Sequence, residues 1–138
     1  MNRDREGGQV MLLVLGLALV AFAVAGLAVD GTRAWLARRT LQNAADSSAL
    51  AGASEIDESV FYRSGGRTVV LDPGRARLVA VDWLGRRGID VRSRIETDRQ
   101  GVRVLLTGDV PTTFLGLVGI RALPVAAQAT AEPLEGAR

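Results

Sequence analysis

The chain has 138 residues, which is room for one modest domain but not for two. Its 17 basic residues are all arginine and stand against 15 acids, so it lacks the clustered positive charge that nucleic-acid binding needs. Cysteine and histidine are absent, which excludes disulfides, thiolate or histidine catalysis and the usual zinc sites, and we expect no cofactor and no nucleic-acid partner.

The first feature along the chain is an apolar run, VMLLVLGLALVAFAVAGLAV, at residues 10–29, behind a short charged head at residues 1–9. A helix of about 20 residues crosses the hydrocarbon core of a bilayer. The rest of the chain has too little apolar surface to enclose such a helix. We therefore predict a transmembrane helix at residues 10–29, with the lipid bilayer as a partner.

A cleaved secretory signal is the rival interpretation of this run. The apolar core of a signal extends to about 15 residues and leads into a small-residue cleavage site. This run is longer, and Asp30, Arg33 and Trp35 follow it on what is still a helical pattern, so a retained anchor is favoured. Arginines lie on both sides of the span, and the charge rule therefore leaves its orientation open.

Beyond the span, residues 30–54 are predicted to continue as an Ala-rich helical extension, because good helix formers dominate and no Pro or Gly cluster interrupts them. In LQNAADSSALAGA, Ala45, Ala49 and Ala53 recur four residues apart and form a face of small side chains. This face allows another backbone to come close. Two uses remain open: docking onto the chain's own sheet, or packing against neighbouring helices.

Residues 55–138 are predicted to form a small α+β domain. VFYRSGGRTVVL, at residues 60–71, predicts a hairpin or an irregular loop with one strand. Asp72 and Pro73 mark the start of a helix, and the apolar spacing that follows predicts that it continues to Gly88.

The spacing of the apolar residues then changes from the helical period of about 3.6 to the alternation of a strand. Alternation in GIDVRSRIET and again after DRQG predicts a β-hairpin, and LPVAAQATAEP predicts a third strand, which Pro124 confines to an edge or a strand start. The predicted fold class is α+β. A transmembrane helix continues into a long pilin-like helix, and a three-stranded antiparallel sheet with one further helix follows.

A series of small and polar residues accompanies the span in a fixed order. After the charged head come a Gly, the span, an Asp at its far edge, an aromatic, an Arg, Leu-Gln and an Ala-Ala-Asp-x-x-Ala-Leu-Ala ending. In this pattern, residues 1–53 resemble the N-terminal segment of TadE/TadG-like proteins of the Tad (Flp) pilus assembly system. TTFLGLVGIRALPVAAQATAE is similar to the carboxyl ends of actinobacterial members. The matching positions are Gly8, Asp30, Trp35, Arg39, Leu41, Gln42, Ala44, Ala45, Asp46, Ala49, Leu50 and Ala51.

The resemblance implies a single-pass protein of the cytoplasmic membrane, with its bulk outside the cytoplasm and other pilus-assembly or secretion proteins, or copies of itself, as partners. Family members that a prepilin peptidase processes have a Gly before the cleavage point and a Glu five residues after it. Gly8 and Gln9 form a candidate processing site, but Leu13 stands where that Glu is expected. This favours an uncleaved anchor over a minor pilin.

Three kinds of function are compatible with the chain. A non-enzymatic, membrane-anchored assembly component leads, a cleaved minor pilin is second, and a tethered binding module or hydrolase is third. A hydrolase would depend on pairs such as Asp57/Glu58 or Asp98/Arg99, which are typical of solvated loops, so we expect no enzyme. The residues expected in helix packing or partner contact are Gly16, Gly26, Asp30, Trp35, Arg39, Gln42, Ala45, Asp46, Ala49 and Ala53.

Overall fold

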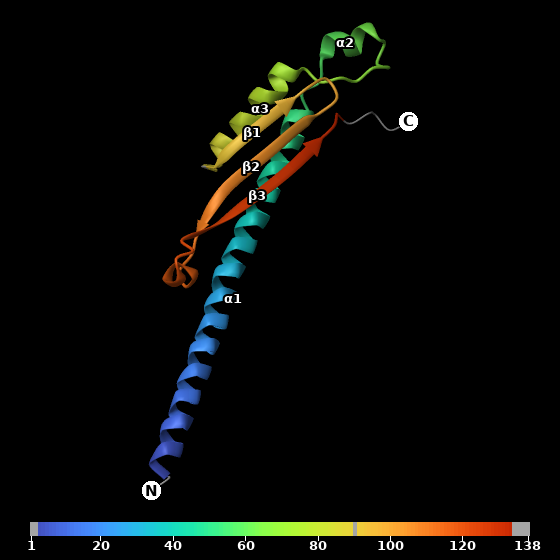
Figure 1. Ribbon diagram of the computed structural model, residues 1–138. Coiled ribbons are helices and arrows are strands. Elements are labelled where there is room, and N and C mark those ends of the chain that lie inside the picture. Colours follow the sequence, from blue (N-terminus) through green and yellow to red (C-terminus); the bar gives the residue numbers. More distant parts are fainter. Residues whose placement is uncertain (1–2, 90, 134–138) are drawn as a thin grey trace. The chain divides into compact units, whose positions relative to one another are not determined.

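The computed structural model describes residues 3–89 and 91–133, with side chains described from residue 8 onward. Parts of the predicted charged head (residues 1–2) and of the predicted C-terminal domain (residues 90 and 134–138) lie outside the described residues. The predicted α+β class is confirmed. The elements in chain order are α1 (Arg3–Ala53), α2 (Glu58–Arg63), α3 (Pro73–Arg86), β1 (Arg92–Thr97), β2 (Val102–Pro111), the short 3-10 helix η1 (Leu115–Val118) and β3 (Ala122–Ala131) (Figure 1).

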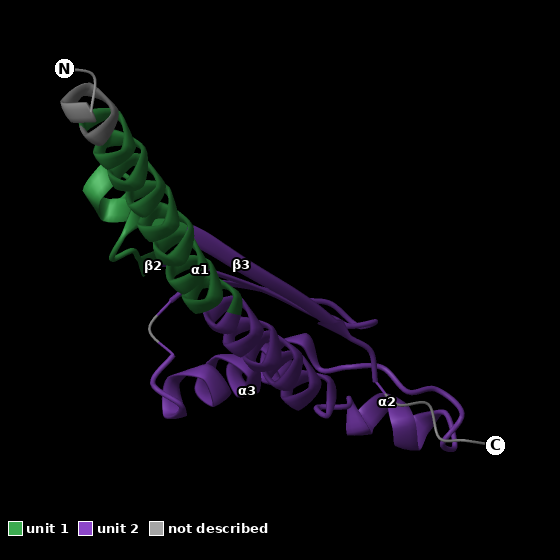
Figure 2. Ribbon diagram, turned by 90° about the horizontal axis from the view of Figure 1, so that it is seen from below, with its two compact units in different colours: residues 1–35, 110–123 green, residues 36–109, 124–138 purple. Residues whose placement is uncertain are grey.

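Two compact units make up the chain (Figure 2). Unit 1 comprises residues 1–35 and 110–123, and unit 2 comprises residues 36–109 and 124–138. Each unit therefore joins one segment of α1 to a segment from far along the sequence, and each has its own internal contacts.

The first part of α1 is apolar and exposed. Within α1, residues 8–53 include a window of 18 residues with mean hydropathy 2.8, and no other helix in the described part of the chain is long and apolar enough to cross a membrane. The large side chains of residues 10–29 are exposed, among them Leu12, Leu19 and Phe22. By length and composition, α1 is consistent with a single-pass membrane anchor.

Unit 2 is built on a sheet with the strand order β1-β2-β3. β1 and β2 pair antiparallel, from Arg92 opposite Thr107 to Thr97 opposite Val102, which confirms the predicted hairpin. The turn between them is closed by the Asp98 carboxylate, which accepts the backbone N–H groups of the last two turn residues. β3, which contains Pro124, is an edge strand, as the proline predicts.

The core of unit 2 lies between the sheet, the second part of α1 and α3. β2 contributes alternate fully buried residues, and α3 contributes one apolar face. The start of α3 is the predicted one: the Asp72 carboxylate accepts the N–H groups of Gly74 and Arg75, with Pro73 at the first helical position. The buried residues outside α1 are Leu71, Ala76, Ala80, Leu84, Ile95, Val102, Val104, Leu106, Ala127 and Ala129.

The segment of residues 60–71 departs from the sequence prediction. Neither a hairpin nor a strand forms there: α2 occupies its first residues, and only an isolated bridge joins Leu71 to Ile56. The helix wins because Asp57 caps it, accepting a hydrogen bond from the Val60 N–H, while Gly65 and Gly66 take the positive φ that ends it. The Ser59 hydroxyl and then the Val60 N–H, by donating to this carboxylate, hold the pKa of Asp57 below its ordinary value.

Candidate functional site

The Asp30 carboxylate of α1 binds the backbone of a loop more than eighty positions further along the chain. Oδ1 accepts the N–H of Thr113 at 2.9 Å, and Oδ2 accepts those of Phe114 at 2.9 Å and Leu115 at 2.8 Å. Asp30 is only 1% exposed, although large apolar neighbours on α1 are open. All of these residues belong to unit 1 (Figure 2). We call residues 112–121 the clamp loop.

Asp30 acts as a helix cap supplied from another element. The first N–H groups of any helix lack partners inside it, and an acidic side chain is the usual acceptor. In η1 the N-cap residue is Phe114, whose side chain makes no cap hydrogen bond. Asp30 takes that place, and its negative charge also suits the positive end of the peptide dipoles.

Two further contacts hold the clamp loop on α1. Arg33 Nη1 donates to Thr113 Oγ1 at 2.8 Å. Gly26 lies against Phe114 so closely that a Cβ built on this glycine would stand 2.5 Å from the Phe114 Cβ. The predicted packing glycine Gly26 therefore has a partner within its own chain, whereas Gly16 has open space on its Cβ side.

The clamp loop is also closed on itself. The N–H of Thr112 donates to the Arg121 carbonyl at 3.0 Å, and the hydroxyl of Thr112 donates to the Ile120 carbonyl. Gly119 ends η1 with φ +93°, a conformation that other residues rarely adopt. The loop is thus held by its own hydrogen bonds as well as by α1.

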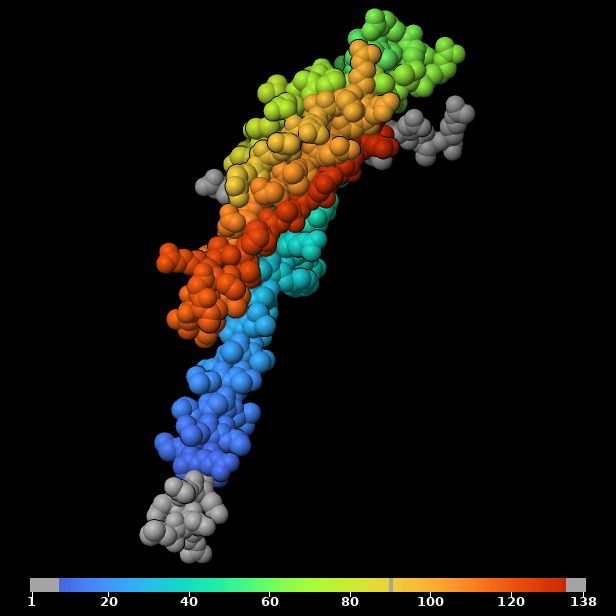
Figure 3. Space-filling view, viewed as in Figure 1, coloured from blue at the N-terminus to red at the C-terminus, as the bar shows by residue number. Residues whose placement is uncertain are grey.

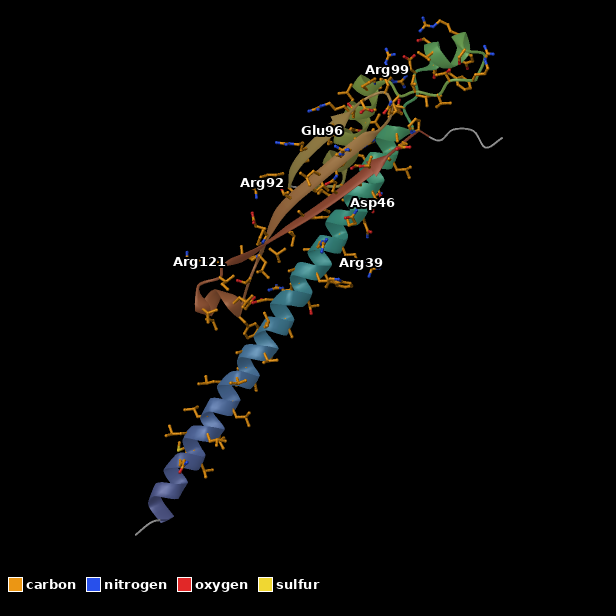
Figure 4. The ribbon with its side chains drawn as sticks, turned by 45° about the vertical axis from the view of Figure 1, so that its right-hand side comes forward. Arg39, Asp46, Arg92, Glu96, Arg99 and Arg121 are labelled. Atoms are coloured by element: carbon orange, nitrogen blue, oxygen red, sulfur yellow. The ribbon has the colours of Figure 1, made fainter. Side chains whose placement is uncertain are left out.

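Apolar side chains project from this closed loop. Leu117 and Val118 are 84% and 74% exposed, and Phe114 and Ile120 are also open. The space-filling view shows the loop as a lobe in orange (Figure 3). Arg121 follows the lobe at the approach to β3 (Figure 4). Exposed aliphatic residues gathered on one small loop are unusual for a surface that meets only water.

In unit 2, two other predicted residues bind the edge strand. Gln42 Nε2 donates to the Gln128 carbonyl of β3 at 2.9 Å and to Asp46 Oδ1 at 3.0 Å. The amide thus joins α1 to the edge strand β3. On the same helix, Arg39 lies before Gln42 and Asp46 lies after it (Figure 4).

The Ala face of α1 packs inside unit 2. Ala45 and Ala49 are completely buried, and Ala53 nearly so. Gly52 beside them marks the closest approach, because a Cβ built there would stand 2.8 Å from the Ala76 carbonyl oxygen of α3. Of the two uses that the sequence left open, docking within the chain accounts for the burial of these alanines. Among the other predicted contact residues, Trp35 and Arg39 are exposed.

The carboxylates that a hydrolase would need have local structural roles. Asp57 caps α2, and Asp98 closes the β1–β2 turn. Within residues 3–89 and 91–133, no group of three or more Asp or Glu side chains is placed to hold a metal ion. Asp57 and Asp98 therefore stabilise the backbone next to them.

Sequence reasoning missed the clamp loop. It treated TTFLGLVGI only as an apolar connection, although two of its properties were visible: the run has no charge, and it is too short to span a bilayer. An acid at the end of an apolar span was visible too. Nothing local joins these two signals, because the residues are 83 to 85 positions apart.

Comparison with known proteins identifies the segment that holds Asp30, Gln42 and the Ala face. Residues 8–55 match the Tad family model, described as Flp pilus-assembly TadE/G-like. Searches of the curated proteins and of the solved structures give no match. The matched segment ends shortly after α1, so the sheet and the clamp loop lie beyond it.

Proposed function

We propose that this chain, which carries a TadE/G-like segment at residues 8–55, is a non-enzymatic, membrane-anchored component of a Tad/Flp-type pilus assembly or secretion apparatus. The observation that carries the proposal is that the matched segment coincides with the exposed apolar helix. An anchor with open apolar side chains suits a bilayer, and the match to a pilus-assembly family model supports an assembly role.

The proposed location is the cytoplasmic membrane, with a single pass and the C-terminal domain outside the cytoplasm. The pilus role supports this orientation, because the fibre is built on the outer side of that membrane. The partners are the lipid bilayer and other assembly or secretion subunits, or further copies of this chain. Burial of Ala45 and Ala49 moves the proposed partner contact to exposed residues of α1, such as Gly16, Trp35 and Arg39.

Deleting the gene is expected to abolish or strongly reduce surface pili, because an assembly platform that lacks an anchored subunit cannot extend the fibre. The measurement is the amount of pilin in sheared surface fractions, together with electron microscopy.

The full chain carrying alkaline phosphatase after Arg138 should restore pili and show phosphatase activity, since this enzyme is active only outside the cytoplasm.

The matched control is a chain without residues 1–29, exported by a cleavable signal peptide. It supplies the same domain without the anchor and should not restore pili. Normal pili in the deletion strain would refute the assembly role. Restoration by the unanchored form would show that the membrane span is dispensable, and an inactive phosphatase fusion would reverse the proposed orientation.

The chain purified from its own host is expected to keep its N-terminal residues, because Leu13 occupies the place of the Glu found in processed members. Intact-mass spectrometry measures this directly. The Gly8→Val variant, which blocks a glycine-dependent cleavage, should differ from the wild type only by the mass of the substitution. A wild-type product that begins at Gln9 would instead support the minor-pilin function.

A further inference from the structure

We propose that the clamp loop is a second membrane contact: its apolar lobe, residues 114–120, inserts into the lipid leaflet that holds the Asp30 end of the span. The inference rests on the membrane anchoring of the proposed function and adds a lipid-binding surface to it. It assigns a role to the exposed side chains of Leu117 and Val118, which the fold leaves without a core.

The first argument is the position of the loop along α1. Phe114 packs on Gly26, which belongs to the apolar run of residues 10–29. Gly26 precedes Asp30 by four residues, or about 6 Å along a helix axis. The lobe therefore lies beside the end of the span itself. If the span is in lipid as far as its last apolar residue, the lobe is at the depth of the interface.

The second argument is the way in which the loop backbone is satisfied. Lipid offers no hydrogen bonds, so irregular backbone enters it only where protein groups pair its N–H groups. Asp30 accepts three N–H groups, and carbonyls of the loop accept others. The loop residues whose N–H groups are paired in these ways are Thr112, Thr113, Phe114, Leu115, Leu117, Gly119 and Ile120. A loop in water could leave these N–H groups to the solvent, whereas a loop in lipid needs protein acceptors for them.

The third argument is the distribution of charge. Residues 112–120 contain no charged side chain, and the one acid that touches them, Asp30, is buried. Arg33 and Arg121 flank the lobe, and both are exposed. Arginines at the border of an apolar surface extend toward phosphate headgroups and are attracted by anionic lipids. An uncharged apolar surface bordered by exposed arginines accordingly suits a lipid leaflet.

The absence of cysteine allows a direct test with single-cysteine variants of the full chain. Leu117→Cys carries an environment-sensitive fluorophore, and the protein is reconstituted at low density in vesicles of phosphatidylcholine and phosphatidylglycerol. We expect blue-shifted emission, and quenching several-fold stronger by lipids with a spin label near the headgroup than by lipids labelled near the chain end.

Leu78→Cys is the matched control, because Leu78 is also a highly exposed leucine, on α3 of unit 2, and should report water. Leu19→Cys, in the middle of the span, should be quenched best by the deep label. Water-like emission at position 117 with deep quenching at position 19 would overturn the lipid contact and leave the anchor intact. Water-like emission at position 117 together with no quenching by the deep label at position 19 would refute the membrane anchor. Blue-shifted emission without lipid quenching, together with crosslinking between chains through position 117, would assign the lobe to a protein contact and overturn the proposal.

Discussion

Replacing Asp30 by alanine is expected to release the clamp loop from α1. Three backbone N–H groups would lose a charged acceptor in one step. Hydrogen bonds to charged groups contribute about 1.5–3 kcal/mol each, and partial hydration of the loop returns some of this. The free energy of opening the loop should therefore fall on the order of 3 kcal/mol, which is about a hundredfold loss of amide protection. Hydrogen exchange of residues 112–121 in the reconstituted full chain measures it.

The size of the effect is tested by two companion variants. Asp30→Asn keeps one acceptor oxygen and turns an amide donor toward the remaining N–H groups, so it should be intermediate. Asp46→Ala removes an exposed acid of the same helix, which accepts a hydrogen bond from Gln42. This variant should leave the hydrogen exchange of the clamp loop unchanged. If Asp30→Ala left the exchange of the loop at its wild-type rate, packing of Phe114 on Gly26 would be the dominant restraint.

The second large effect is expected at Gly52, where α1 comes closest to α3. A Cβ built there would stand 2.8 Å from the Ala76 carbonyl oxygen and 3.2 Å from Val102 Cγ2. Neither atom can move away easily, because one is backbone and the other belongs to a fully buried residue. Gly52→Ala should therefore destabilise unit 2 by about 1–3 kcal/mol despite the better helix propensity of alanine. For a domain of this size, each kcal/mol lowers Tm by about 4–8 °C.

Gly85→Ala is the matched control for this substitution. Gly85 is also helical, in α3, but a Cβ built there has nothing within 4 Å. It should raise stability by about 0.5–1 kcal/mol, the ordinary gain of alanine over glycine in a helix. Thermal unfolding of the full chain in detergent, followed by circular dichroism, compares the two variants. An equal gain in both would mean that α1 and α3 have room between them.

Several residues of the segment that matches the TadE/G-like model make contacts inside the chain. Asp30 caps η1, Gln42 binds β3, and the Ala face fills the core of unit 2. Asp30 thus holds the clamp loop within unit 1, and Gln42 and the Ala face hold the sheet within unit 2. The proposed contacts with other subunits and with lipid must then use the outer residues, which are the exposed side of α1 and the lobe of the clamp loop.

The sequence by itself determined the features that arise from neighbouring residues. The apolar run in α1, the cap of α3 at Asp72, the β1–β2 hairpin and the edge position of the strand with Pro124 were all predicted. Each depends on a period or a cap that acts over a few positions, so the signal is present in a short window. The exception was α2: the local pattern of residues 60–71 predicted strand, but Asp57 caps a helix that begins at Glu58.

Only the tertiary structure decided which distant residues meet. Asp30 is 83 to 85 positions from the N–H groups that it binds, and Gln42 is 86 positions from Gln128. An aspartate at the end of a span looks the same whether it faces water or caps a helix from another part of the chain. A small residue such as Gly52 likewise does not reveal which backbone approaches it. Such pairings depend on the packing of whole elements, because tertiary context overrides the local preferences that a short stretch of sequence shows.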